Sequence, residues 1–278
     1  MAEYIKREQI LGALMEKAAA GIPIIGFGAG SGLTGACAET EGVDYICVYS
    51  TAICRMQGVS STLAWLPYSN CNEEVFRISS EILPLVHHTP CVAGVGAHDP
   101  RVDMDSTIDK LISMGYSGIN NEPFVNQYTG AFRELLEEEN LGFSREVELI
   151  RKAHAKDIFT LAWISSEDEA AEMIRAGADV LGIMIGYKND NETDEEYLIR
   201  STDEVNSIVS CVRKMDPAKI MLIHGGPYYS PEAVQYTFER SDVNGYATGS
   251  TGEKYPVKQG IHEALSAYKT LKLRGKSE

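Results

Sequence analysis

The chain has 278 residues, of which 44% are hydrophobic and 23% charged, an ordinary composition for a globular protein with a core of its own. The formal net charge of −15 argues against a surface that binds nucleic-acid phosphates, and such an acidic excess is typical of solvated outer helices. The six cysteines form no C-x-x-C pair, the N-terminal residues lack the apolar stretch of a signal peptide, and no segment has the length and apolarity of a membrane span. We therefore expect a cytoplasmic protein with reduced thiols, and with neither nucleic acid nor membrane as a partner.

Eight short apolar runs, separated by amphipathic helical patterns, recur along the chain. Most are apolar at every position, which is typical of parallel strands covered on both faces. The predicted strands span residues 22–27, 45–49, 91–96, 118–121, 159–164, 180–185, 220–224 and 245–248. Their alternation with helices, without a linker, predicts an α/β fold in which residues 1–278 form a single (β/α)8 TIM-barrel domain. A doubly wound open sheet is the alternative.

Several helix starts are marked by capping residues. Ser166 with Glu169, and Ser201 with Glu204, match the S-x-x-E capping box, and Ser230 precedes a proline suited to the first helical position. Before the first strand, a helical stripe of apolar residues predicts an extra helix that closes the bottom of the barrel. This stripe consists of Ile10, Leu11, Leu14, Met15 and Ala18. The connections 50–72 and 186–201 are long enough to be functional loops.

In a barrel of this kind the chemistry lies at the C-terminal ends of the strands and in the loops that follow them. The first strand runs into a glycine-rich loop in which Gly28, Gly30 and Ser31 could cradle a carboxylate or phosphate. A tight turn that needs small residues is the structural alternative, and the loop lacks the lysine of a Walker motif.

Two further glycine turns follow the last two strands. Gly225 and Gly226 come after the seventh strand, and Gly249 and Ser250 after the eighth, which is where many barrels hold phosphate. We expect an anion site here. The alternative is that these glycines serve the curvature of the barrel.

Four residues at strand ends could transfer protons. His98 follows the third strand and His224 ends the seventh, so both imidazoles could reach one central ligand, although a strand-end histidine often makes only a structural hydrogen bond. Asp99 is the best-placed carboxylate for a divalent cation such as Mg²⁺, with helix capping as its alternative role. Glu122, after the fourth strand, is the second candidate acid or base.

Two more residues could bind a substrate directly. Asn121 could donate to a substrate oxygen, and Arg55, in the long second loop, could clamp a carboxylate or phosphate. Arg55 could equally be a solvated or ion-paired loop residue.

At these loops the sequence resembles a known family in stretches that run in order along nearly the whole chain. The matching stretches are 25–35 (IGFGAGSGLTG), 55–58 (RMQG), 66–68 with Asn72, 93–95 with Asp99-Pro100, Met104-Asp105, 146–154, 176–179 and 224–227 (HGGP). Together they resemble the phosphoenolpyruvate hydrolase-like family of TIM barrels. The resemblance implies a barrel related to phosphoenolpyruvate mutase and aldolase types, with a small phosphorylated or 2-oxo acid substrate. Barrels of this kind are often homo-oligomers, and we expect one here.

The sequence departs from the family pattern at the rim. Residues 183–186 (IMIG) replace a stretch with a histidine, the loop from Tyr187 is polar and acidic, and Glu122 stands where relatives have phenylalanine. His98 replaces a small or hydroxyl residue. We expect His98 or Glu122 to transfer protons in this chain.

Three hypotheses follow from the sequence. The first is a hydrolase or lyase acting on a phosphoenolpyruvate-like or 2-oxo acid substrate. The second is a non-catalytic barrel that senses a small metabolite, since fold alone does not decide activity. The third is a phosphate-independent retro-aldol C–C lyase, because the acidic sixth loop would repel a dianion.

Overall fold

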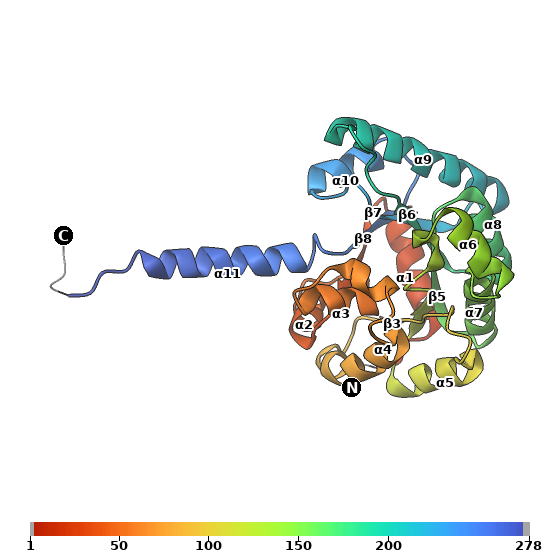
Figure 1. The fold of residues 1–278 in the computed structure, drawn as a ribbon, viewed down its shortest axis with the longest axis horizontal. Helices are drawn as coiled ribbons and strands as arrows, with labels where there is room; N and C mark the ends of the chain where they lie inside the picture. The colour runs from red at the N-terminus through yellow and green to blue at the C-terminus, as the bar shows by residue number, and fades with distance from the viewer. Residues whose placement is uncertain (1–2, 275–278) are drawn as a thin grey trace.

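In a computed structural model, which describes residues 3–274, eight parallel strands pair in chain order and β8 closes on β1 (Figure 1). The closed barrel confirms the predicted fold and excludes the open sheet. The strands are β1 (Ile24–Ala29), β2 (Tyr45–Val48), β3 (Cys91–Gly94), β4 (Gly118–Asn120), β5 (Phe159–Ile164), β6 (Val180–Ile185), β7 (Ile220–Gly225) and β8 (Gly245–Thr248).

The first strand begins two residues later than the sequence indicated, and the reason is chemical. Pro23 has no backbone N–H to donate, so the ladder starts at Ile24, whose N–H donates to the Asn244 carbonyl at 2.9 Å. Ile22, predicted as a strand residue, is 51% exposed. The strand instead extends to Ala29, inside the glycine-rich loop.

Helices cover the outside of the barrel and pack on it through two apolar clusters, while a third cluster fills the interior. The helices up to the last strand are α1 (Arg7–Ala19), α2 (Gly32–Thr40), α3 (Ser50–Met56), α4 (Cys71–Ile82), α5 (Met104–Met114), α6 (Gly130–Glu138), α7 (Phe143–Ala155), α8 (Glu167–Ala176), α9 (Asp194–Met215) and α10 (Pro231–Phe238). Three short 3₁₀ turns, Ser61–Trp65, Leu83–Leu85 and Val125–Gln127, complete these connections.

The N-terminal helix α1 closes the bottom of the barrel, as predicted. It contacts β1, β5 and β7, so it crosses from one side of the ring to the other. Ile10 and Leu14 are buried in the interior cluster, with Leu11 and Ala18 packed against it. Met15 belongs to the predicted stripe but points to solvent, 51% exposed.

Two of the predicted helix starts are confirmed and one is wrong. The hydroxyls of Ser166 and Ser230 cap α8 and α10. Ser201, however, lies inside α9, which begins at Asp194 behind a capping box formed by Thr193 and Glu196. The stronger box upstream starts the helix, and the loop after β6 is therefore shorter than expected. The connection 50–72 is also more ordered than a loop, because it contains α3 and a 3₁₀ turn.

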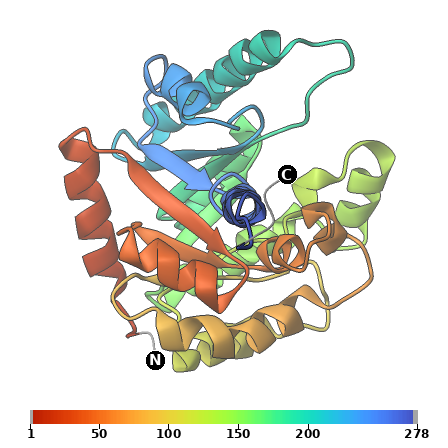
Figure 2. The same ribbon diagram turned by 90° about the vertical axis from the view of Figure 1, so that its left-hand side faces the viewer.

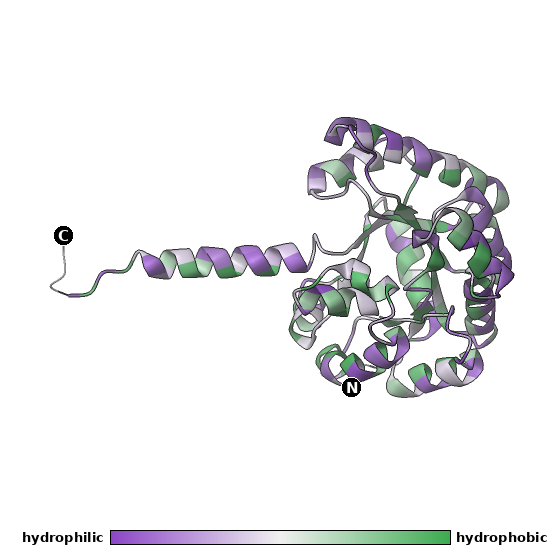
Figure 3. Ribbon diagram, viewed as in Figure 1, coloured by the Kyte–Doolittle hydropathy of each residue, from purple (hydrophilic) through white to green (hydrophobic). Residues whose placement is uncertain are grey.

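The last helix, α11 (Lys254–Lys269), does not return to the barrel. It projects away from it in Figure 1 and is seen nearly end-on in Figure 2, and none of its residues is buried. Large side chains with apolar surface nevertheless recur on it: Ile261, Leu265 and Tyr268 are each more than half exposed. Figure 3 shows green, hydrophobic segments along this helix. Among the described residues, no helix is both long and apolar enough to cross a membrane.

Candidate functional site

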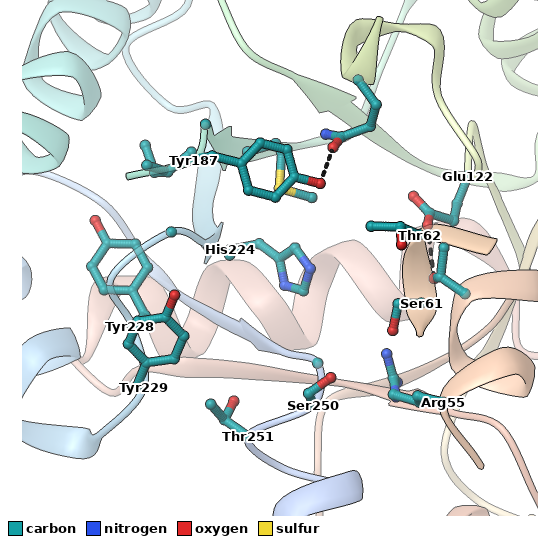
Figure 4. A pocket seen from close by; sticks show the side chains of 18 of the residues that line it. Arg55, Ser61, Thr62, Glu122, Tyr187, His224, Tyr228, Tyr229, Ser250 and Thr251 are labelled. Carbon is teal, nitrogen blue, oxygen red and sulfur yellow. Dashed lines mark hydrogen bonds between the residues drawn. The ribbon is translucent and has the colours of Figure 1, made fainter. Parts of the chain in front are cut away.

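A pocket of about 290 Å³ opens at the mouth of the barrel, on the side where the strands end (Figure 4). The segments after β2, β4, β6, β7 and β8 supply its lining residues. In Figure 4 the imidazole of His224 lies near the middle, between Tyr228 and Tyr229 on one side and Glu122 and Arg55 on the other. Arg55, Glu122 and His224, which were predicted to bind a substrate or transfer protons, therefore share one cavity.

Arg55 lies on α3, and its side chain is buried, not solvated. Its Nε donates to the Glu253 carboxylate and its Nη2 donates to the Gly28 carbonyl at 2.5 Å. Burial alone would lower the pKa of Arg55, but the Tyr49 hydroxyl and the Glu253 carboxylate raise it overall. Arg55 is thus a permanent cation in the pocket wall, as an anion-binding role requires.

Glu122 follows β4 and is 5% exposed. The Thr51 hydroxyl donates to its carboxylate at 2.8 Å. Burial raises the pKa of Glu122 to about 7, against the opposing effects of Thr51 and the Arg55 charge. Its protonated and ionised forms are therefore both populated near neutral pH, the property that suits a side chain to general acid or base catalysis.

His224 ends β7 and packs on Trp163, with the ring centroids 4.9 Å apart. Its Nδ1 lies 2.6 Å from the Ala247 carbonyl oxygen, and because a carbonyl only accepts, Nδ1 carries the proton. Burial lowers the pKa of His224 to about 4, so the ring is neutral at physiological pH. Its Nε2 is then a hydrogen-bond acceptor, free to take a proton from a ligand or water.

Both predicted glycine turns line the pocket beside His224. Gly225 and Gly226 have φ of 72° and 55°, and a Cβ on Gly226 would lie 2.5 Å from Ile185. The turn after β7 therefore requires glycine for its backbone conformation and for its close approach to Ile185. Gly249 and Ser250 face the same cavity from β8.

The glycine-rich loop after β1 does not line this pocket. A Cβ on Gly28 would lie 2.1 Å from the Tyr49 hydroxyl, so the glycine makes room for protein. Ser31 caps α2, and the Gly30 N–H donates to the Glu253 carboxylate at 2.6 Å. The predicted carboxylate cradle is thus filled by a carboxylate of the protein itself.

The two histidines expected to converge do not do so in this pocket. His98 is largely buried. It does not line the pocket, because the segment after β3 does not reach the cavity. Asn121 is also outside it: its amide donates to Glu146 and to the Trp163 carbonyl, and its oxygen accepts from the Trp163 N–H. Asn121 therefore holds β4 against β5 and has no free donor for a substrate.

Asp99, the expected metal ligand, is engaged by the neighbouring Arg101. The Arg101 guanidinium and backbone N–H both donate to its carboxylate, which lowers the pKa of Asp99, and Asp99 does not line the pocket. The helix cap nearby is Asp103. Across residues 3–274, no group of three or more His, Cys, Asp or Glu side chains is arranged to hold a metal ion.

The pocket itself offers a cation one carboxylate, since Glu122 is the only Asp or Glu among its lining residues in residues 3–274. Burial raises the pKa of Glu122 to about 7, so a metal ion would have to displace the proton from part of the population at neutral pH. Proteins hold Mg²⁺ through one or two carboxylates together with waters and substrate oxygens, so Glu122 is the lining residue that would hold it here. The roles proposed below involve no metal.

Sequence reasoning missed two sets of residues in and around the pocket. The first is Glu253, which contacts Arg55 across 198 positions of sequence. The second is a set of tyrosines that line the pocket: Tyr187, Tyr228 and Tyr229, which lie across the cavity from Arg55 in Figure 4, together with Tyr246 and Tyr255. Tyr187 after β6 and the pair Tyr228-Tyr229 after β7 were the available signal for this set.

The fold and the position of the pocket define a (β/α)8 barrel with a cavity at its mouth. A model of the phosphoenolpyruvate hydrolase-like family matches residues 9–271, and the chain belongs to that family. The ToMV susceptible protein tm-1(GCR26) of Solanum lycopersicum is 35% identical over 272 residues, covering 96% of this chain and 36% of the tomato protein. The chain thus spans little more than a third of that relative.

Solved structures with the same barrel include two enzymes. A phosphonopyruvate hydrolase, in complex with oxalate and Mg²⁺, has a TM-score of 0.61 at 14% identity, covering 95% of this chain and 86% of that one. An oxaloacetate acetylhydrolase also has a TM-score of 0.61 at 14% identity, covering 98% and 90%. At such identities the likeness establishes the fold.

Proposed function

We propose that this protein is a hydrolase or lyase that acts on a small 2-oxo acid or phosphoenolpyruvate-like acid at the mouth of the barrel. The observation that carries the proposal is the placement of Arg55, Glu122 and His224 in the walls of one cavity. The three supply a fixed cation, a carboxyl that exchanges its proton near neutral pH, and a neutral acceptor. Family membership and the two hydrolases of the same fold support this class of reaction.

The chemistry follows from what each group can do. When a bond to the carbon atom next to a carbonyl group breaks, the electron pair of that bond stays on the carbon and is delocalised onto the carbonyl oxygen as an enolate. The Arg55 guanidinium stabilises the negative charge on the oxygens, which is the main catalytic contribution expected of a preorganised site. Protonated Glu122 returns a proton to the carbon, and Nε2 of His224 accepts the proton of the attacking water or of a substrate hydroxyl.

The charge of the pocket favours a substrate without phosphate. Within the described chain, Arg55 is the one lysine or arginine among the lining residues, and the facing wall is aromatic. A phosphoryl group usually needs several cations or a metal. This observation favours the phosphate-independent C–C lyase or hydrolase over an enzyme for phosphorylated acids.

A direct assay separates these alternatives. The protein is incubated with oxaloacetate, phosphonopyruvate or phosphoenolpyruvate, each with and without Mg²⁺, and products are followed by ¹H and ³¹P NMR. We expect turnover of oxaloacetate and none of phosphoenolpyruvate. Binding of these acids without turnover, seen as a raised melting temperature, would support the metabolite sensor instead.

A variant of His224 tests its role in this reaction. His224→Asn keeps an N–H near the Ala247 carbonyl but removes the Nε2 acceptor, so we expect kcat to fall about 100-fold with a similar melting temperature. The neutral ring predicts that no limb of the pH profile between pH 5 and 9 belongs to His224. A kcat within threefold of wild type contradicts the assignment.

We also propose that the protein is a homo-oligomer in which α11 packs on a second copy. On the outside of the barrel, a groove of about 410 Å³ runs between α10 and the edge formed by β8 and β1. This is where the helix after β8 would lie in a complete barrel. Its walls include Ile25, Val234 and Phe238, which match the apolar stripe of α11. Because Glu253 is buried directly before α11, the helix has no flexible linker by which to fold back onto its own groove.

Charges placed on this stripe are expected to separate the subunits. We predict that Ile261→Glu combined with Leu265→Glu yields a monomer in sedimentation velocity, because the two carboxylates cannot be buried in an apolar groove. Lys258→Glu combined with Lys269→Glu on the same helix is the control for added negative charge. A monomeric wild-type protein, or an unchanged oligomer in the double variant, contradicts the proposal.

A further inference from the structure

We propose that Glu253 is a positioning residue, which holds the guanidinium of Arg55 in the orientation that lets it bind the substrate. The inference rests on the proposed function of Arg55 as the anion-binding group. Glu253 follows β8 and is 1% exposed, yet it is not itself a lining residue of the pocket. Its action on a ligand must therefore pass through the residues that it touches.

Each oxygen of the Glu253 carboxylate has a distinct set of partners. Oε1 accepts from the Gly30 N–H and from the Thr34 hydroxyl, both at 2.6 Å, and Oε2 accepts from Arg55 Nε. The first oxygen thus fixes the carboxylate to the start of α2, and the second is left to hold the arginine. The loop after β1, which the sequence suggested as an anion site, serves as the seat of this carboxylate.

The remaining contacts of Arg55 define which edge of its guanidinium is available. Nε is taken by Glu253, and Nη2 donates to the Gly28 carbonyl at 2.5 Å. Because the guanidinium is planar, these two contacts fix its plane. The Nη1 edge is directed toward the turn after β8: a Cβ on Gly249 would lie 3.8 Å from Nη1. Gly249 lines the pocket, so this edge is the one that meets an anion.

The fold alone gives little reason for this pair. Both side chains are removed from water, and a buried ion pair is often no more stabilising than well-packed apolar residues of similar volume. Burying one charge to orient a second charge that faces a ligand is, by contrast, a common arrangement behind a binding site. Glu253 therefore has the geometry expected of a residue that supports Arg55.

Glu253→Gln is the variant that acts on this support most selectively. The amide keeps one carbonyl oxygen, which can still accept from Gly30 and Thr34. Its NH₂ group then faces Arg55 Nε–H, donor against donor, and displaces the guanidinium. Thr34→Val is the matched control, because it removes a hydrogen bond from the same carboxylate and leaves both its charge and its contact with Arg55.

The experiment is a double-mutant cycle read by calorimetric binding of oxalate, with and without Mg²⁺, to the full-length chain. We expect Arg55→Lys to weaken binding about 100-fold, Glu253→Gln about 30-fold, and the double variant no more than Arg55→Lys alone. Thr34→Val is expected to bind within about threefold of wild type. Glu253→Asp, which keeps the charge, should recover part of the loss and replaces Glu253→Gln if that variant does not fold.

The outcomes distinguish the two proposals. If Arg55→Lys weakens oxalate binding and neither Glu253 variant does, the positioning role is wrong while the proposed function stands. If the losses of Arg55→Lys and Glu253→Gln add, Glu253 acts independently of Arg55 and the inference is again wrong. If wild-type protein does not bind oxalate, the proposed function fails and this inference fails with it.

Discussion

Glu122→Gln is expected to lower kcat about 1000-fold, the largest effect of any single substitution considered. The amide still accepts the hydrogen bond from Thr51, so the cavity keeps its shape, but it has no proton to give. Steady-state kinetics with the substrate identified by NMR measures the change. Glu74→Gln, on the outer helix α4, is the control for the exchange, because Glu74 lies outside the pocket. It should leave kcat within about threefold.

The same substitution should remove a pH dependence. With a pKa of about 7, Glu122 acting as an acid predicts that kcat/KM is constant below pH 7 and falls above it. In Glu122→Gln this descending limb should be absent. A profile that rises through pH 7 would assign the ionised carboxylate, and hence a general base, to this position.

Glu122→Gln is expected to raise the free energy of unfolding at high pH, although it lowers activity. The folded pKa of Glu122 is about 7 against an ordinary value of 4.5. Between these values the unfolded chain ionises Glu122 while the folded chain keeps it protonated, so the folded state loses stability as the pH rises. The loss reaches about 3 kcal/mol above pH 7. Urea unfolding should therefore show Glu122→Gln to be more stable than wild type at pH 8 and little changed at pH 5.

Arg55→Lys is expected to lower kcat/KM about 300-fold, which corresponds to about 3 kcal/mol of transition-state stabilisation. Lysine keeps the positive charge, but its single nitrogen cannot contact Glu253 and the Gly28 carbonyl while also presenting an edge to the pocket. Arg77→Lys, on the outer helix α4, is the control for the exchange itself. A loss confined to KM would indicate that Arg55 binds the substrate and its transition state equally.

Arg55→Lys is also more informative than Arg55→Ala. Removing the cation altogether would leave the Glu253 carboxylate buried without a partner, at a cost of several kcal/mol of folding stability. Loss of activity in Arg55→Ala would then be hard to separate from unfolding. Thermal unfolding of Arg55→Lys beside its kinetics keeps the two effects apart.

The barrel could be predicted from the sequence because its strands are buried on both faces. Runs such as Phe159–Ile164 and Val180–Ile185 are apolar at nearly every position, and their predicted bounds are those of β5 and β6. Errors arose where a local signal had a stronger neighbour. Ser201 has the sequence of a helix cap, but the capping box at Thr193 starts the helix eight residues earlier.

Arg55 was predicted from its place in the long second loop, and the other candidate site residues were predictable where strand ends reach the pocket. Glu122 and His224 were found in this way. His98 was expected by the same rule, but the segment after β3 does not reach the cavity, and loop paths are decided by contacts between distant segments. Glu253 lies in a short glycine-containing turn without periodicity, and its partners Gly30 and Arg55 are remote in sequence. The sequence of α11 likewise does not indicate which surface its exposed apolar residues contact.

The helix α1 has a consequence for how ligands move. It seals one end of the barrel with Ile10 and Leu14, and the interior between it and the mouth is packed with side chains. Anything bound beside Arg55 must therefore arrive and depart by one route. A reaction product that keeps its carboxylate on Arg55 blocks the next molecule, so inhibition by such a product should be competitive and overcome by excess substrate.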